Sequence, residues 1–226
     1  MQSTSPKRKP LKVVFCIPGR SFSNTFLRCW TDLLAWCLQN NIQALLSNAY
    51  DSNVYKVRNN ILGADDRGDK NQDPFGGQLD YDYIMWIDSD MAFAPEHFKQ
   101  LLDMKKDIAT GIYKTADNIH YATVKDWDLD FFKKEGRFEF LTDEHLQTEE
   151  PIFTVEYNGF GWMLMKKGVI ESLEYPWFRP IWHEVDSNLH TFTSEDVGFC
   201  QKAIEKGYKI YANKNLIIGH EKSWIL

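Results

Sequence analysis

The stretch Tyr83-Ile84-Met85-Trp86-Ile87-Asp88-Ser89-Asp90 carries the strongest structural signal in the chain. Its first five residues form an apolar, β-prone run with the length of a buried strand. The run ends directly at two carboxylates, Asp88 and Asp90. Because residues i and i+2 of an extended chain project to the same side, both acids are expected to reach one divalent cation. A turn or helix-capping role is the alternative for this tripeptide.

The residues around this stretch predict alternating strands and helices. Strands are predicted at 12–17, 42–46, 83–87, 108–113, 153–157, 210–212 and 216–218, and helices begin near residues 23, 51, 95, 169 and 193. This order favours an α/β fold with a mostly parallel sheet and helices on both faces. Ligands of such sheets bind beyond the carboxyl ends of strands, where residues 18–20 and 88–90 both lie. No repeat or second domain is evident.

Composition narrows the class of protein. The chain has 226 residues, 43% of them apolar, and a net charge of −6, which favours a folded domain and argues against nucleic-acid binding. Four cysteines without CxxC spacing predict buried free thiols and a reducing compartment. No apolar run is long enough to span a bilayer, and residues 1–10 predict a flexible arm without a signal peptide. We therefore expect a cytoplasmic protein.

A second acidic cluster, Thr193-Ser194-Glu195-Asp196, precedes an apolar helical pattern. A capping box in which Thr193 caps the helix and Asp196 completes the box is one explanation. The other is catalytic: a carboxylate here accepts a proton as a general base, with Asp196 as the first candidate and Glu195 as the second.

Three further residues are candidates for binding a ligand. His220 follows the last predicted strand and is a candidate metal ligand, with an ordinary core or surface histidine as the alternative. Arg20 and Arg58 are candidates for contacts with a nucleotide or phosphate, because a guanidinium donates two hydrogen bonds at once. A solvated surface position is the alternative for Arg58.

The segment Asn158-Gly159-Phe160-Gly161-Trp162 combines glycines with aromatic side chains. Such a segment lets backbone approach a ligand closely and presents rings to a sugar, so Gly161 and Trp162 are predicted ligand contacts. A plain β-turn is the competing interpretation.

Taken together, these motifs resemble the GT-A glycosyltransferases, in particular the family 2-like enzymes of bacteria, phages and large viruses such as algal viruses. The matching segments are residues 13–20, 83–91, 159–164 and 194–200, with Gly207-Tyr208 and His220. The resemblance implies one Rossmann-like domain over residues 11–226, with a nucleotide-sugar half at 11–115 and an acceptor half at 116–226. Residues 117–150 and 175–188 match nothing in the family pattern.

The resemblance also implies roles for the site residues. Pro18, Gly19 and Arg20 would border the nucleotide base. Asp88, Ser89 and Asp90 would face a metal-bound diphosphate. His220 would complete the ligands of Mn²⁺ or Mg²⁺, and Asp196 would be the base.

The implied activity is transfer of a hexose from a nucleoside-diphosphate sugar to a glycan or glycoprotein acceptor, in the cytoplasm of a bacterium or virus-infected cell. A UDP-sugar is favoured over a GDP-sugar, and inversion over retention. A sugar nucleotidyltransferase is one alternative, although residues 18–20 make a poor phosphate loop. A non-catalytic nucleotide-sugar-binding module, which would tolerate the loss of Asp196, is the other.

Overall fold

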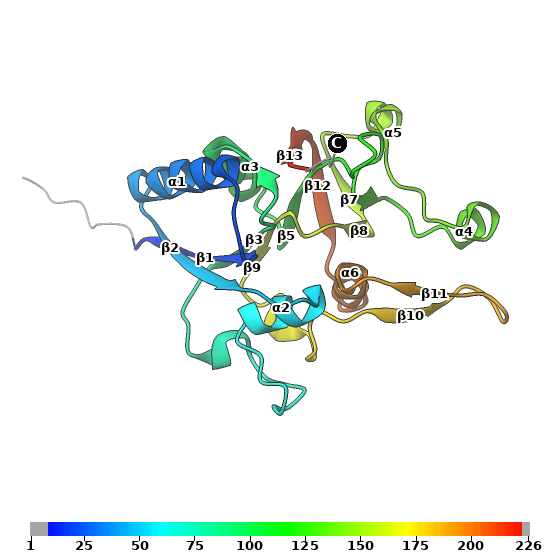
Figure 1. Cartoon of the computed structure of the whole chain (residues 1–226), viewed down its shortest axis with the longest axis horizontal. Helices are drawn as coiled ribbons and strands as arrows, with labels where there is room; N and C mark the ends of the chain where they lie inside the picture. Colours follow the sequence, from blue (N-terminus) through cyan, green and yellow to red (C-terminus); the bar gives the residue numbers. More distant parts are fainter. Residues whose placement is uncertain (1–8, 223–226) are drawn as a thin grey trace, which may run out of the picture.

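A seven-stranded sheet forms the centre of the computed structural model, which describes residues 9–222 (Figure 1). The strand order is β2-β1-β3-β9-β5-β12-β7. Five strands run parallel, namely β1 (Leu11–Pro18), β2 (Ile42–Ala49), β3 (Tyr83–Ile87), β5 (Ile108–Ile112) and β12 (Ile210–Ile217). The antiparallel strands are β9 (Trp162–Lys166) and β7 (Ile152–Val155). The predicted α/β fold with a mostly parallel sheet is confirmed. Residues 1–8 of the predicted arm lie outside the described residues.

Helices cover both faces of the sheet, as predicted. On one face, α1 (Asn24–Gln39) and α3 (Pro95–Met104) bury apolar side chains against the strands. On the other, α2 (Val54–Ile61) and α6 (Glu195–Glu205) do the same. Within the described chain no helix is both long and apolar enough to cross a membrane.

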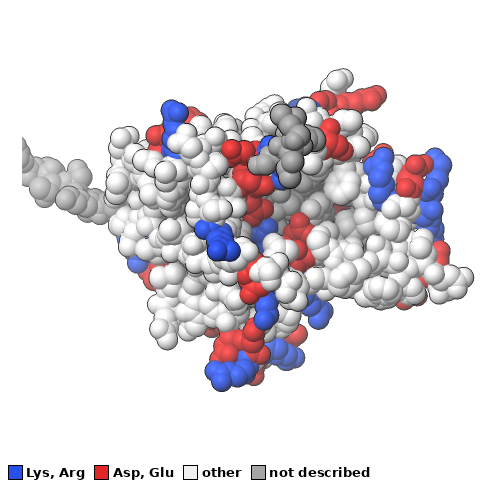
Figure 2. All heavy atoms as spheres, viewed as in Figure 1, with Lys and Arg blue, Asp and Glu red and all other residues white. Residues whose placement is uncertain are grey.

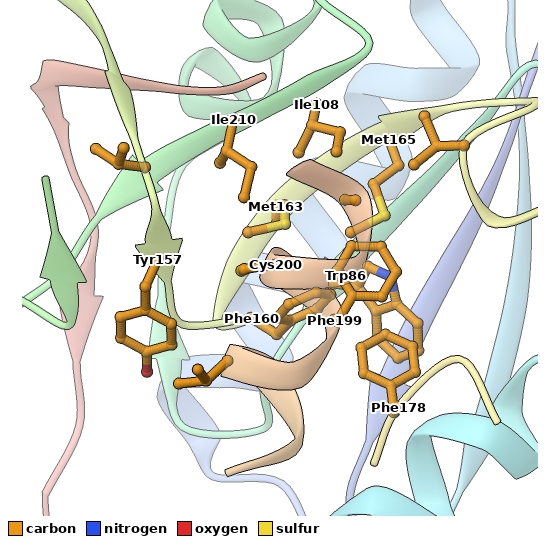
Figure 3. Packing of buried hydrophobic residues seen from close by; sticks show 14 of the residues in the cluster. Trp86, Ile108, Tyr157, Phe160, Met163, Met165, Phe178, Phe199, Cys200 and Ile210 are labelled. Carbon is orange, nitrogen blue, oxygen red and sulfur yellow. The ribbon is translucent and has the colours of Figure 1, made fainter. Parts of the chain in front are cut away.

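A cluster of aromatic rings lies under α2 and α6 (Figure 3). Trp86 and Phe178 meet edge to face with centroids 5.1 Å apart, and Phe160 and Phe199 do so at 5.0 Å. Edge-to-face pairs add to the stabilisation that burial of the rings provides. Because Trp86 belongs to β3 and Phe199 to α6, the cluster packs these two elements together.

Small elements accompany the sheet, and of these only the turn near residue 170 is predicted from the sequence as a helix. These are two-stranded pairs, β4 (Met91–Ala92) with β13 (Gly219–His220), β6 (Thr123–Val124) with β8 (Tyr157–Asn158), and β10 (Ile181–Glu184) with β11 (His190–Thr193). The short helices are α4 (Leu129–Glu135), α5 (Asp143–Thr148) and the 3₁₀ turns η1 (Pro74–Gly77) and η2 (Ile170–Ser172).

Several predicted boundaries are wrong. The two strands expected at 210–212 and 216–218 are one strand, β12, with an irregularity between Asn213 and Ile217. The N-cap of α6 is Ser194, because the buried Thr193 hydroxyl instead donates to the Ile181 carbonyl at 3.2 Å. The N-cap of α2 is Asn53 rather than residue 51 or 52. All four cysteines are free thiols, as predicted, and all but the half-buried Cys29 are buried.

Candidate functional site

The candidate site lies at the carboxyl edge of the sheet, where β1 and β3 end side by side. The Asp88 amide donates to the Gly161 carbonyl at 3.2 Å, which fixes the turn after β3. A Cβ atom at Gly19 would lie only 2.8 Å from the Ser89 Cβ, so the two predicted strand-end segments are in contact. Figure 2 shows acidic side chains gathered along the middle of the molecule's face in that view.

Arg58 is the buried centre of the site. Its side chain is 4% exposed and lies over the rings of Trp86 and Phe160, at 5.5 and 5.2 Å from their centroids. The guanidinium Nε is 3.0 Å from Glu195 Oε1, and Nη2 is 3.1 Å from Asp88 Oδ1. The alternative of a solvated surface arginine is therefore wrong. Arg58 links the end of β3 to the start of α6.

Arg58 thus pairs with two carboxylates, the buried Glu195 and the partly exposed Asp88. Burial raises the pKa of Asp88 and of Glu195, and Arg58 opposes this rise. Burial would lower the pKa of Arg58, but the charges of Asp88 and Glu195 raise it, so the guanidinium stays charged. Nη2 donates its hydrogen bond to Asp88 Oδ2 at 3.2 Å, which leaves Oδ1 without a hydrogen bond. A buried oxygen of this kind gains from a donor supplied by a ligand.

Asp90 faces His220 across the edge of the sheet. His220 Nε2 lies 3.0 Å from Asp90 Oδ2, and His220 Nδ1 lies 2.7 Å from the carbonyl oxygen of Lys114. A carbonyl oxygen only accepts hydrogen bonds, so Nδ1 carries a hydrogen. Nε2 can then either donate a second hydrogen bond to the Asp90 carboxylate or share a cation with it. Metal-binding histidines commonly use their second nitrogen as Nδ1 is used here.

The charge balance around Asp90 differs from that around Asp88. Burial opposes ionisation of Asp90, but hydrogen bonds from His220 and Lys222 lower its pKa to about 2. The Lys222 ammonium lies 2.7 Å from the same oxygen that faces His220. Asp90 is therefore a carboxylate held ionised by its surroundings, and its Oδ2 is shared between the His220 ring and the Lys222 ammonium.

The three predicted metal ligands do not converge. Across residues 9–222, no group of three or more His, Cys, Asp or Glu side chains is arranged to hold one metal ion. Asp88 is paired with the guanidinium of Arg58, and whether it shares a cation with Asp90 stays a prediction. Asp90 and His220 are brought together.

Asp196 lies half-buried in the first turn of α6. Its Oδ2 accepts from the Tyr157 hydroxyl at 2.9 Å, and its Oδ1 accepts from the Val197 amide at 2.8 Å and from the Ser194 hydroxyl. Burial and the charge of Asp196 raise the pKa of Tyr157 well above its usual value, so Tyr157 stays a donor. Glu195 is 4% exposed and paired with Arg58, which is incompatible with its predicted role as the second candidate base.

The predicted ligand contact of Trp162 is also wrong. Trp162 is fully buried and packs on Phe93 with ring centroids 4.7 Å apart, because β9 lies in the middle of the sheet between two cores. Gly161 serves the turn instead: its amide donates to the Tyr113 hydroxyl at 3.1 Å, and a Cβ there would lie 2.8 Å from Tyr113 ring atoms.

The sequence did not point to three residues of the site. Tyr157 and Lys222 contact the candidate base and Asp90, respectively. Tyr50, whose ring lies 5.7 Å from the exposed Arg20 guanidinium, adds an aromatic surface beside residues 18–20. A cavity of about 460 Å³ opens beside His220, lined by Lys114, Thr115, Ala116, Asn118, residues 217–220 and Lys222. Only the position of each residue just after a strand could have indicated them.

Comparison with known proteins supports the fold by structure alone. No protein-family model and no curated protein matches the sequence. The structure is similar to that of A197 from STIV, with a TM-score of 0.53 and 16% identity over 96% of each chain. It is also similar to GalNAc-T7, crystallised with UDP, GalNAc and Mn²⁺, with a TM-score of 0.53 and 10% identity over 95% of this chain and 43% of that one. The fold is that of the GT-A class.

Proposed function

We propose that this chain is a metal-dependent glycosyltransferase that moves a hexose from a nucleoside-diphosphate sugar to a glycan or protein-linked acceptor. The observation that carries the proposal is the Asp90–His220 pair, in which His220 Nδ1 is occupied by a backbone carbonyl and Nε2 faces the carboxylate. This pair lies at the edge of the GT-A sheet. The structurally similar GalNAc-T7 was crystallised with UDP and Mn²⁺, which supports a nucleotide donor of the same kind. A UDP-sugar is the favoured donor, with a GDP-sugar second.

The residues of the first half would bind the donor. Asp90 and His220 would hold Mn²⁺ or Mg²⁺, which when bound offsets the charge that develops on the departing diphosphate. Arg58 orients Asp88, whose Oδ1 is left to accept a hydrogen bond from a donor hydroxyl. Pro18, Gly19 and Arg20, with the ring of Tyr50, would border the base. In this proposal the donor binds to residues 11–115, and His220 completes its site.

Asp196 would act on the acceptor. Its carboxylate takes the proton of an acceptor hydroxyl as the oxygen attacks the anomeric carbon. The bond from that carbon to the diphosphate breaks on the opposite side, which inverts the configuration. The Tyr157 hydroxyl and the Val197 amide hold the carboxylate in place for this step. A carboxylate that is ion-paired with Arg58 is a poor proton acceptor. Asp196 makes no ion pair with Arg58, so it is the better candidate for the base.

The binding of UDP should depend on Mn²⁺ through Asp90. We expect Asp90→Ala to reduce the affinity for UDP in the presence of Mn²⁺ to the value measured without metal. His220→Ala should weaken UDP binding by about 10- to 100-fold, the range for disturbing the surroundings of a metal site. This loss is smaller than that of Asp90→Ala, because a neutral imidazole does not offset the charge of the cation. Isothermal calorimetry with and without Mn²⁺ measures both effects.

Asp103→Ala is the matched control, since this acid is exposed on α3 and pairs only with Lys99. It should leave UDP affinity and its metal dependence unchanged. If Asp90→Ala binds UDP with the parent's affinity and the parent's response to Mn²⁺, the proposed donor site is wrong.

A further inference from the structure

The hairpin of β10 and β11 projects beside α6 (Figure 1). It carries a strip of exposed aromatic rings. Trp182 is paired with Phe192 across the two strands, and each side chain is 67% exposed. The His190 ring stacks on Trp182 with centroids 5.3 Å apart and planes at 19°. The three rings share one face of the hairpin, where alternate residues of each strand project to the same side.

The opposite face fixes the hairpin to α6. Thr193 is buried, and its hydroxyl bonds the Ile181 carbonyl. At Gly198 in α6, a Cβ atom would lie 2.2 Å from the Arg179 carbonyl oxygen and 3.3 Å from Ile181 Cγ2. The helix backbone therefore touches the start of the hairpin directly. The strand β11, which carries His190 and Phe192, is followed directly by α6.

The first turn of α6 contains Asp196, the proposed base. Phe192 precedes Asp196 by four residues, so their Cα atoms are at most roughly 14 Å apart even in extended chain. The strip thus begins within that distance of the proposed base. An extended acceptor bound at Asp196 can continue onto the hairpin.

The chemistry of the strip fits a sugar chain. Sugars present apolar ring faces that stack on aromatic side chains and hydroxyls that bond to polar groups. Exposed carboxylates of Glu184 and Asp186 lie on the same hairpin and can accept from such hydroxyls. These acids, with the net charge of −6, disfavour an anionic membrane or a nucleic acid. A neutral glycan offers ring faces for stacking and hydroxyls for the carboxylates, and it carries no charge that these acids would repel.

We propose that Trp182, His190 and Phe192 form an acceptor-binding platform that stacks on the sugar rings of a glycan acceptor next to Asp196. The proposal rests on the proposed transferase function, and it names the class of acceptor: an oligosaccharide of several residues rather than a single sugar or a bare peptide.

The test uses the full chain and an array of neutral oligosaccharides. We expect the parent to bind a subset of them and Trp182→Ala to bind the same subset roughly 10-fold more weakly, as for loss of one ring contact. Trp182→Phe, which keeps a ring, should retain most of the affinity. Leu38→Ala is the control, because Leu38 is 81% exposed on α1. UDP affinity with Mn²⁺ should be unchanged in all three variants.

Tryptophan fluorescence gives a second readout. Among the tryptophans of residues 9–222, Trp182 is the exposed one, so the difference in acrylamide quenching between the parent and Trp182→Ala reports on it. A bound oligosaccharide should protect this emission in the parent and not in Trp182→Ala.

Three results would overturn the platform: equal glycan affinity of parent and Trp182→Ala, bound glycan that leaves quenching unchanged, or a parent that binds no glycan but dimerises through Trp182. In each case intact Mn²⁺-dependent UDP binding would leave the donor site standing. If the parent binds glycan but does not bind UDP, the proposed transferase function is wrong instead.

Discussion

Replacing Asp196 with asparagine is expected to reduce sugar transfer by ~10²–10⁴-fold, the contribution of a general base. The variant keeps the shape of the side chain. Its amide oxygen can still accept from the Val197 amide, and its nitrogen can donate to the Tyr157 hydroxyl oxygen. UDP affinity and melting temperature should therefore remain close to those of the parent. Turnover of a UDP-sugar, with hydrolysis of the donor in place of transfer until an acceptor is known, measures the loss.

This experiment separates an enzyme from a nucleotide-sugar-binding module. Glu195→Gln is the matched comparison, because Glu195 is adjacent in sequence but is bonded to Arg58. It should lower stability more than Asp196→Asn does. Turnover of Asp196→Asn within a few-fold of the parent would assign this carboxylate to the start of α6 and remove it from catalysis.

Replacing Arg58 with methionine is expected to destabilise the fold by about 3–5 kcal/mol, the cost of leaving a buried ion pair without one partner. Asp88 and Glu195 would both lose the cation that offsets their burial. For a domain of this size the melting temperature should fall by roughly 6–20 °C. Thermal unfolding followed by circular dichroism measures the change.

The stability lost in Arg58→Met should depend on pH, because Glu195 titrates. Burial raises the pKa of this carboxyl group in the folded state, and removing Arg58 raises it further. Stability linked to a raised carboxyl pKa is present below the unfolded pKa and is lost as pH increases through the folded one. Arg58→Met should therefore be closest to the parent near pH 5 and furthest from it near pH 8.

A double variant provides the control for the arginine. Adding Glu195→Gln to Arg58→Met removes one stranded charge, so it should recover part of the lost stability and flatten the pH dependence. If Arg58→Met melts within 2 °C of the parent at pH 7, the ion pairs contribute little and the buried cluster does not organise the site.

The parts of the fold that the sequence predicts are those with a strong local pattern. The apolar run of β3 stands out because the strand is buried on both faces. The start of α1 is marked by Ser23, whose hydroxyl accepts from the Phe26 amide. In each case residues that are neighbours in sequence decide the structure, so a local pattern suffices.

The errors arise where distant contacts decide. Arg58 is buried because Glu195, 137 residues away, supplies a counter-charge, and no local pattern reveals that partner. Trp162 follows a glycine-rich turn that indicates a ligand contact, but its strand lies between two apolar clusters. The hairpin at 181–193 exposes its rings, so it lacks the alternation of apolar and polar residues that predicts a half-buried strand.

The place of β9 in the sheet limits how the gene can be divided. This strand, Trp162–Lys166, pairs with β3 on one side and β5 on the other, so β3 and β5 do not pair with each other. A fragment ending at residue 115 would contain β3 and β5 with two unpaired edges where β9 belongs, a state prone to aggregation. The proposed donor and acceptor halves are thus one folding unit. A split gene would yield soluble protein only when both fragments are synthesised together.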